Sequence, residues 1–317
     1  KDKLHFFANL ERIDQNRGVT MNMPARPELN FSDFTHDNVW NWMVRMDHQI
    51  NSGNTWAVRY LRETSPQSNQ FPGVTNWTKS RAEKETDTEY SVVGTLNSVI
   101  KGTKVNSLKL SYTKEDVFFG NPGYFDTGDQ ASLAPRLIFQ THEDGFSTRA
   151  NRRIDPAYQF DESFAWFVPG KRGDHDLKFG ASIVHTPLHI YDTSTLNGQF
   201  SFSSSDADFN AANPRTYPDR LTVRVPSPSD FIVKGTYYGV FVQDKWKINN
   251  RLTASLGVRW DTEVLPIQEK DNPDFASPDD YPRDMNNFAP RIGLTWSLDD
   301  AGSSVIRGGW GQVYQKT

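Results

Sequence analysis

The sequence predicts an all-β chain that forms a transmembrane antiparallel β-barrel. Three observations favour this fold class. Apolar residues recur at every second position, the connections between these segments alternate in length, and aromatic residues make up 13% of the 317 residues. Hydrophobic residues are only 36% of the chain and mean hydropathy is -0.67. A barrel strand, however, needs apolar side chains only on its lipid face, so a low mean hydropathy is compatible with a membrane location.

Alternation of period two is clearest in residues 252–260. One face of this segment carries the apolar residues Leu252, Ala254, Leu256, Val258 and Trp260, and the other carries Thr253, Ser255, Gly257 and Arg259. No run approaches the roughly 18 apolar residues of a membrane helix. The same alternation predicts about eleven spanning strands, which start near Leu4, Asn38, Thr55, Thr88, Val105, Phe160, Asp176, Lys234, Leu252, Phe288 and Ser304.

The connections fall into two length classes. Short polar turns are expected at 51–54, 101–104, 170–175, 249–251 and 299–303. Long connections are expected at 14–36, 65–87, 116–155, 191–230 and 265–287. Tight periplasmic turns and long extracellular loops produce this rhythm in a barrel. Strand direction then alternates without error, provided that the apolar pieces at 136–140 and 198–202 belong to loops.

Most tryptophans lie near predicted strand ends, where an amphipathic ring suits the membrane interface. The alternative for these residues is the core of a soluble β-sandwich. The tryptophans in question are Trp40, Trp42, Trp56, Trp166, Trp246, Trp260, Trp296 and Trp310.

The number of predicted strands is odd, and the sequence ends within a strand. Both observations predict that further strands close the barrel.

Several function classes are excluded by composition. Net charge is -4 with scattered Lys and Arg, so no nucleic-acid partner is expected. The chain has no Cys, which excludes disulfides and thiolate metal centres. Gly-x-Ser-x-Gly, His-Glu-x-x-His and phosphate-loop motifs do not occur, so we expect no enzyme, no catalytic residue and no cofactor.

The segment FVQDKWKINNRLTASLGVRWD, at 241–261, closely resembles a strand-turn-strand unit of TonB-dependent receptors. Three further segments are similar to the same family: MVRMDHQINSGNTWAVRY at 43–60, HDLKFGAS at 175–182, and NFAPRIGLTWSL at 287–298 followed by SVIRGGWGQVY at 304–314. Their order resembles the Oar-like subgroup, large receptors with an N-terminal carboxypeptidase-regulatory-like domain. The resemblance covers nearly the whole chain.

This resemblance implies an outer-membrane location in a Gram-negative-type bacterium and a barrel of about 22 strands with a plugged lumen. Residues 1–317 would belong to a single barrel domain and supply about half of its wall. The plug domain, the TonB-contacting segment and the closing strands have no matching stretch here. The implied function is energy-coupled uptake of a scarce ligand. The implied partners are outer-membrane lipid, an unknown small ligand, and TonB acting through a plug outside this chain.

Two groups of residues are candidates for function. Four aromatic residues of the long connections could stack on a ligand, or else pack loop against loop: Trp77, Tyr124, Phe125 and Tyr217. Three charged residues are expected to face the lumen, where they would hold a plug or form a solvated ion-pair lattice: Arg259, Asp261 and Arg291.

No metal site is predicted. His185 and His189 share a strand face with Asp192 nearby, but Pro187 interrupts the strand and two imidazoles make an incomplete coordination shell. The acidic connection at 271–284 lacks the glycine-centred spacing of a calcium loop. Both groups are therefore interpreted as structural or solvated residues.

Two alternatives to transport stay open. One is an outer-membrane barrel used for adhesion or envelope organisation without uptake. The other is a secreted β-rich protein that binds or cleaves polysaccharide through surface aromatics and paired carboxylates. A plug and a TonB-contacting segment in the complete gene would favour transport, whereas solubility without detergent would favour the secreted protein.

Overall fold

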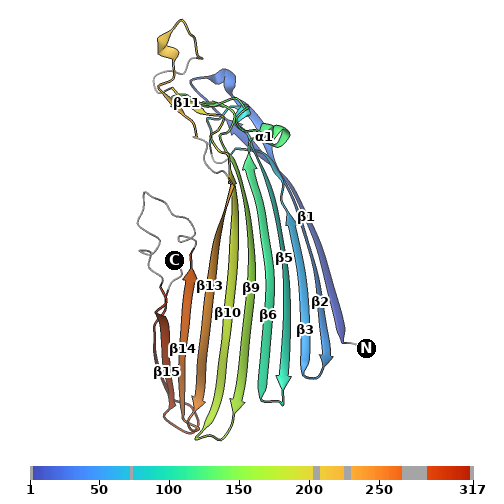
Figure 1. Cartoon of the computed structure of the whole chain (residues 1–317), viewed down its shortest axis with the longest axis vertical. Coiled ribbons are helices and arrows are strands. Elements are labelled where there is room, and N and C mark those ends of the chain that lie inside the picture. The colour runs from blue at the N-terminus through green and yellow to red at the C-terminus, as the bar shows by residue number, and fades with distance from the viewer. Residues whose placement is uncertain (1–2, 72–73, 203–207, 225–229, 266–283, 315–317) are drawn as a thin grey trace.

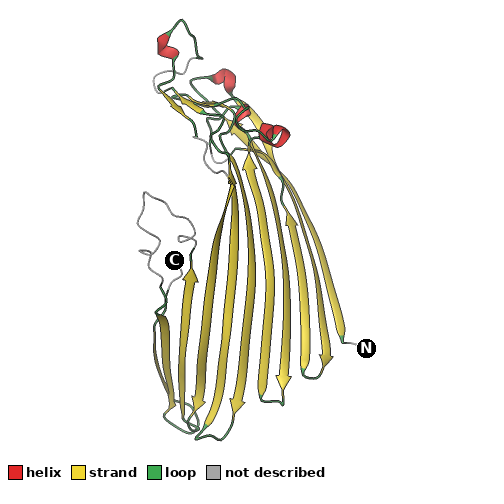
Figure 2. Cartoon of the chain, in the orientation of Figure 1, coloured by secondary structure: helices red, strands yellow, loops and turns green. Residues whose placement is uncertain are grey.

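A single layer of long strands dominates the computed structural model (Figures 1 and 2). The structure describes residues 3–71, 74–202, 208–224, 230–265 and 284–314. The long strands are β1 (Leu4–Met21), β2 (Phe31–Asn51), β3 (Asn54–Thr64), β5 (Glu83–Ile100), β6 (Lys104–Gly120), β9 (Ala150–Val168), β10 (Asp174–Asp192), β13 (Asp230–Lys247), β14 (Leu252–Val264), β15 (Asn287–Ser297) and β16 (Val305–Gly311).

Each long strand pairs antiparallel with the next along the chain, in the order β1-β2-β3-β5-β6-β9-β10-β13-β14-β15-β16. A short strand, β4 (Gln67–Gln70), joins β2 and β5 beyond the end of β3. The prediction of about eleven strands with alternating directions is therefore confirmed within the described residues. This up-and-down order is that of a membrane barrel, in which each hairpin adds two strands to the wall.

The apolar pieces at 136–140 and 198–202 lie outside this wall, as the prediction required. β7 (Arg136–Ile138) pairs in parallel with β11 (Gln199–Ser201). Together with β8 (Glu143–Gly145) and β12 (Arg220–Thr222) they form a separate four-stranded sheet. The long connections thus fold into a structure of their own beyond one end of the wall.

Local hydrogen bonds explain why the short turns are short. Asn51 accepts hydrogen bonds from the Gly53 amide and the Asn54 side chain, both at 2.9 Å. Gly53 is required there because a Cβ would stand 2.8 Å from the Val99 carbonyl oxygen. In the β15–β16 turn, Asp299 accepts from the backbone amides of Ser303 and Ser304 at 2.9 and 3.0 Å. These side chains replace the backbone partners that the reversing chain loses.

Several strands extend further than alternation predicts. β1 continues to Met21, β6 to Gly120, and β9 begins at Ala150, so parts of the expected long connections are strand. Polar residues occupy both faces of the β1 extension, whereas the end of β6 has apolar residues on both faces, with Phe118 on one and Val117 and Phe119 on the other. In both cases the alternation fades in the sequence. Beyond the lipid both faces of a strand meet water, which removes the need for an apolar face.

The helices are short and lie at the same end as the long connections (Figure 2). They are η1 (Pro27–Leu29), η2 (Lys79–Arg81), α1 (Pro122–Thr127) and η3 (Pro214–Thr216). In the part of the chain that the structure describes, no helix is long and apolar enough to cross a membrane.

Register divides the wall into two faces of opposite character. One register row joins Val44, Tyr60, Val92, Tyr112 and Tyr158 from β2 to β9. Large apolar side chains stand exposed on this face, including Leu110 at 52% and Ile292 at 55%. We name this the outer face, because exposed apolar rows of this extent belong against lipid.

The opposite face, the inner face, is polar. The neighbouring register row joins Arg45, Arg59, Val93, Ser111 and Gln159 across the same strands. Because side chains alternate across a strand, the residues next to each lipid-facing residue lie on this face, and four of the five in this row are polar. This arrangement matches a wet or plug-filled lumen and not the apolar interior of a β-sandwich.

Aromatic residues mark two levels of the outer face. Tyr158 and Trp166 on β9, and Tyr238 and Trp246 on β13, are each eight residues apart, as are Phe288 and Trp296 on β15. At about 3.3 Å per residue this is roughly 26 Å along a strand, or about 20 Å of height at a strand tilt near 40°. The repeated spacing is close to the apolar band between the two aromatic girdles of a barrel.

Candidate functional site: the inner wall and the loop cap

Tyr237, Arg259 and Asp261 form a hydrogen-bonded network on the inner face of β13 and β14. Nε of Arg259 lies 2.9 Å from both carboxylate oxygens of Asp261. Nη2 of Arg259 donates to the Tyr237 hydroxyl at 2.6 Å, and that hydroxyl donates to Asp261. The three side chains are half-buried and hold one another in fixed positions, so they offer an ordered polar surface.

Gly239 provides the space for this network. It pairs with Asp261 in the register between β13 and β14. A Cβ at this position would lie 2.7 to 2.8 Å from the Arg259 guanidinium, the Tyr237 hydroxyl and the Asp261 carboxylate. Glycine is therefore needed because the side chains of three neighbouring positions cross over it.

Arg291 lies on the same face but outside the network. It pairs with Gly257, which shares the face of Arg259 and Asp261. Its side chain is exposed and has no ion-pair partner among the described residues. The three predicted lumenal residues thus share a face, and the structure brings two of them into contact.

A row of carboxylates crosses four strands of the inner face, and sequence reasoning missed it. Glu63 pairs with Glu89, Glu89 with Glu115, and Glu115 with Asp155. Arg153 compensates one of them, because its Nη2 lies 2.8 Å from the Glu115 carboxylate. Like charges directly opposite each other destabilise a sheet, so this row needs water or a cationic surface facing it.

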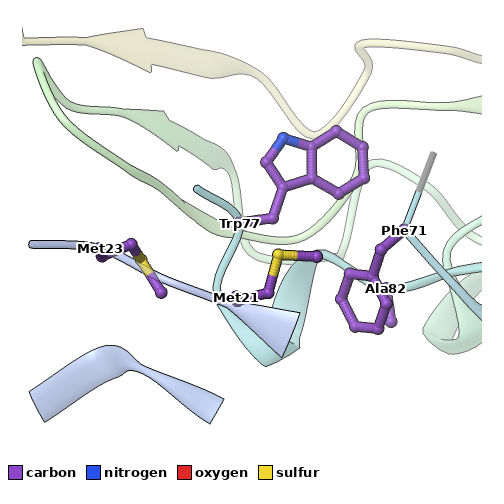
Figure 3. Close-up of a cluster of buried hydrophobic side chains, with 5 residues drawn as sticks. All are labelled: Met21, Met23, Phe71, Trp77 and Ala82. Atoms are coloured by element: carbon purple, nitrogen blue, oxygen red, sulfur yellow. The ribbon is translucent and has the colours of Figure 1, made fainter. Parts of the chain in front are cut away.

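The loops form a cap at one end of the wall, and the buried core of this cap packs on the inner face. The loop cap consists of residues 22–30, 65–71, 74–82, 121–149, 193–202 and 208–224. Its buried core contains Met21, Met23, Phe71, Trp77 and Ala82 (Figure 3). Met21 pairs with Phe31 and shares the inner face of β1 with Phe7, because the register is continuous between them. The core therefore sits on the lumenal side of the wall.

Buried polar groups hold the loop cap together. Arg81 is 1% exposed, donates to the Phe146 carbonyl at 2.9 Å, and lies 3.4 Å from Glu143. Glu143 also accepts from Arg136 at 2.7 Å. Gln130, 2% exposed, donates to Asn197 at 2.9 Å. These contacts connect loops that come from different parts of the chain, although Arg81 Nε and Gln130 Oε1 are buried without a hydrogen-bond partner among the described residues.

Two ionisable groups of the loop cap have shifted pKa values. Burial lowers the pKa of Arg81 to about 10, and the nearby positive charge of Arg136 adds to this effect. Burial alone would raise the pKa of Asp144, but hydrogen bonds from Thr78 and Ser80, at 2.5 and 2.7 Å, lower it on balance. Both groups stay charged at neutral pH, so the cap interior contains fixed charges.

Trp77 lies inside the loop cap. It is 8% exposed, and the Arg81 guanidinium lies 4.4 Å from its ring centroid. In the structure this aromatic residue packs loop against loop. A deeply covered indole of this kind contributes apolar burial and a cation–π contact to the cap.

Tyr124 and Phe125 lie at the outer face. Both belong to α1 and pack on Phe118, with ring centroids 5.1 and 4.5 Å away. Phe118 shares the outer face of β6 with Tyr112, so these two aromatics point away from the lumen. Lys84 reaches to 4.5 Å from the Phe125 ring centroid.

Tyr217 is the exposed aromatic of the four. It is 42% exposed and directly follows η3, the short gold helix at the far tip of the loop cap in Figure 1. Its ring lies 5.3 Å from that of Phe209, which is 61% exposed, and its hydroxyl donates to the Ala211 carbonyl at 2.8 Å. Two ordered, exposed rings form a surface on which a planar or sugar-like ligand can stack.

The histidines considered for metal binding have other partners. His185 lies 2.8 Å from the Thr236 hydroxyl, and His189 contacts the Asp230 carboxylate. Among the described residues, no three His, Asp or Glu side chains gather in a way that could hold a metal ion. Most of the acidic connection at 271–284 lies outside the described residues.

These features define a class of protein: a membrane-spanning antiparallel β-wall with a lipid-facing apolar side, a polar lumenal side and folded loops at one end. A family model described as "Outer membrane beta barrel domain" matches residues 21–317. The chain belongs to this family. It is therefore an outer-membrane protein of a Gram-negative-type bacterium, as predicted.

Solved structures support the same fold. The outer membrane transporter YddB from Escherichia coli is 11% identical, with a TM-score of 0.66, over 98% of this chain and 36% of that chain. FpvA of P. aeruginosa, bound to a heterologous pyoverdine and iron, is 11% identical, with a TM-score of 0.54, over 94% and 40%. The RagAB peptide transporter is 9% identical, with a TM-score of 0.53, over 94% and 33%. No curated protein matches the sequence.

At these identities the similarity shows the fold alone. The chain spans between 33% and 40% of the length of these three structures. The predicted resemblance to TonB-dependent receptors is confirmed for the barrel wall, whereas the Oar-like subgroup stays a prediction.

Proposed function

We propose that the chain forms the wall and extracellular loops of an energy-coupled, TonB-dependent outer-membrane transporter. The observation that carries the proposal is the loop cap, whose core packs on the inner-face residues Met21 and Phe31. Loops that only shielded the barrel from outside would not need to cover the lumenal side. A folded cap over a polar lumen favours capture of a ligand before its passage.

In this proposal the inner wall faces a plug domain that lies outside residues 1–317. Arg259 and Asp261 present an ordered ion pair to the plug. Arg291, which has no ion-pair partner among the described residues, presents a cation two positions along β15 from Ala289, the partner of Arg259. TonB would act on the plug and not on this wall. The proposal assigns no catalytic step to the chain.

The ligand contact that we propose within the loop cap is the pair of exposed rings Phe209 and Tyr217. The ligand is a small molecule too scarce or too large for simple porins. Tyr124 and Phe125 face away from the lumen, and Trp77 supports the cap from within.

Genetic epistasis tests the proposal. Native cells that lack this gene, TonB, or both would be grown on single limiting nutrients: ferric citrate, a dipeptide, or a disaccharide. A transporter predicts that the single deletions share a growth defect on at least one nutrient and that the double deletion adds nothing. If deletion of this gene reduced growth by the same factor in cells with TonB and in cells without it, the proposal would be contradicted.

Adhesion or envelope organisation is the second candidate function. The exposed ring pair at the far tip of the loop cap favours it, because such a tip could equally contact a neighbouring surface. This function predicts that deletion of the gene changes cell aggregation or detergent sensitivity regardless of TonB. The secreted polysaccharide protein has no support, because the chain belongs to an outer-membrane family.

A further inference from the structure

A cavity of about 450 Å³ lies on the outer face near the extracellular end of β5, β6, β9 and β10. Its lining includes Thr88, Asp116, Phe118, Arg152 and Tyr191. The register places all five on the same side as the apolar rows. The cavity therefore opens away from the lumen, and a transported ligand does not pass through it.

Tyr124 covers this cavity from the loop cap. Asn121 caps α1 by accepting a hydrogen bond from the Gly123 amide at 2.7 Å, and the helix ends at Gly128 with a φ of +70°. The short helix seats Tyr124 against Phe118 on β6, with ring centroids 5.1 Å apart. The lining thus combines an aromatic ring with threonine hydroxyls and a charged pair, a set of groups that suits a sugar.

Cationic side chains lie in and beside the cavity. Arg152 binds Asp116 through Nε and Nη2, at 2.8 and 2.9 Å, which leaves Nη1 without a hydrogen-bond partner among the described residues. Lys114 lies 3.7 Å from the same carboxylate, and Lys84 stands beside Phe125. Asp116 is the one carboxylate among the described lining residues. Arg152 and Asp116 balance each other in the lining, and Lys114 and Lys84 add positive charge beside it, which favours a phosphorylated ligand.

The cavity stands just above the lipid. Asp116 lies four residues outward from Tyr112, whose ring belongs to the upper aromatic row with Tyr158. Four residues rise roughly 10 Å at 3.3 Å per residue and a tilt near 40°. This height corresponds to the headgroup layer of the outer leaflet, which in Gram-negative bacteria consists largely of phosphorylated, acylated glucosamine disaccharides.

An apolar groove lies directly below the cavity on the same four strands and continues onto β3. Its volume is about 540 Å³, and its outer-face lining includes Gly94, Leu110, Phe160 and Ile183. Gly94 leaves the groove open, because nothing lies within 4 Å of the Cβ that a larger residue would add. A polar, cationic cavity above an apolar groove matches an amphiphile with a phosphorylated headgroup and acyl chains.

We propose that this cavity and groove bind one molecule of the phosphorylated glycolipid of the outer leaflet, the lipid A portion of lipopolysaccharide. Arg152 and Lys114 bind a headgroup phosphate, Tyr124 covers a glucosamine ring, and the acyl chains follow the groove past Gly94. The site is independent of the transport proposed above, because it lies on the opposite face of the wall.

The test uses the full-length protein, purified in detergent and stripped of native lipid, and native mass spectrometry with bisphosphorylated hexa-acylated lipid A. The double variant Lys114→Gln/Arg152→Gln is expected to weaken lipid A binding at least tenfold. Arg153→Gln is the matched control: Arg153 adjoins Arg152 on β9 and also pairs with a carboxylate, Glu115, but on the inner face. This control is expected to bind within twofold of the wild type.

Further probes separate the contributions of the phosphates, the acyl chains and the sugar. Lipid A without phosphates should bind at least fivefold more weakly, and Gly94→Leu should weaken binding by filling the groove while the barrel stays heat-modifiable on gels. Soluble glucosamine 1-phosphate should not compete. Equal binding by the double variant, an equal loss in Arg153→Gln, or full competition by glucosamine 1-phosphate would each overturn the proposal. If the double variant does not fold, Tyr124→Ala and Gly94→Leu decide the question.

Discussion

At the scale of single residues, Glu162 is the clearest exception to the pattern of the outer face. It shares that face with Phe160 and Phe164, and it lies four residues from both Tyr158 and Trp166, midway between the aromatic levels. It has no ion-pair partner among the described residues. A carboxylate facing the centre of the lipid is costly, although less so than a lysine or arginine.

Glu162→Leu is therefore expected to stabilise the barrel by about 1 to 2 kcal/mol in lipid vesicles, because it removes a charge from the apolar band. Urea unfolding followed by tryptophan fluorescence measures this change. Asp161→Leu is the matched control. Asp161 faces the lumen and accepts from Ser182 and Gln159, both at 2.7 Å, so its loss should destabilise by about 1 to 3 kcal/mol. Effects of the same sign would contradict the face assignment.

Gly239→Val tests the Tyr237–Arg259–Asp261 network. The new side chain would displace three groups that lie 2.7 to 2.8 Å from the added Cβ, so the network must break. We expect a loss of about 1 to 3 kcal/mol in the free energy of unfolding. Gly18→Val, at a glycine with nothing within 4 Å of the added Cβ, should change it by less than about 0.5 kcal/mol. Equal effects at both glycines would show that the network does not contribute.

At the scale of elements, the loop cap depends on charges that strands and helices bring together. Arg81 is buried beside Glu143 and over Trp77. Arg81→Met would leave Glu143 with Arg136 alone and remove a covered cation, so the cap should loosen while the wall stays folded. Trypsin is expected to cut Arg81→Met within 121–149 at least tenfold faster than the wild type. The control Lys79→Met, at an exposed lysine of the same helix, should be cut at the wild-type rate. Unchanged cutting of Arg81→Met would contradict this role.

The lowered pKa of Asp144 leads us to expect that the loop cap is sensitive to acid. Its pKa in the folded cap is below the ordinary value of 3.8, so the charged carboxylate stabilises the fold above that value. This stabilisation is lost as pH falls from about 4 through the lower folded pKa. Pepsin should therefore begin to cut 121–149 as pH falls from about 4 to 2. The Asp144→Asn variant should be cut at both pH 4 and pH 2. A wild-type protein that resists pepsin equally at both pH values would contradict this role of Asp144.

Elements were partly predictable from the sequence for a physical reason. Alternation identifies a strand only where one face meets lipid and the other meets water, as at Leu252 to Trp260. It fades at the outer end of β1, where both faces are polar, and at the outer end of β6, where loop residues cover Val117 and Phe118, and the prediction ended those strands too early. The pieces at 136–140 and 198–202 were placed correctly in loops because the alternating direction of the spanning strands leaves no room for them.

At the scale of the whole molecule, the fold class, the strand count and the two faces followed from the sequence, whereas the sites did not. The carboxylate row joins Glu63 to Asp155, and the glycolipid cavity joins Thr88 to Tyr191. Both depend on the lateral register between strands that are far apart in the chain. A sequence shows which face a residue occupies, but the register across neighbouring strands appears only in the folded wall.

The central claim is that the sheet is a membrane wall with lipid on one face and a lumen on the other. The chain has no Cys, so single cysteines can be placed at each position from 158 to 166 on β9 of the membrane-embedded protein. The account predicts that a water-soluble maleimide labels cysteines at the odd positions, from 159 to 165. It also predicts that a fluorophore attached to a cysteine at an even position is quenched by lipid-attached quenchers. Labelling without this period of two, or lipid quenching at the odd positions, would contradict it.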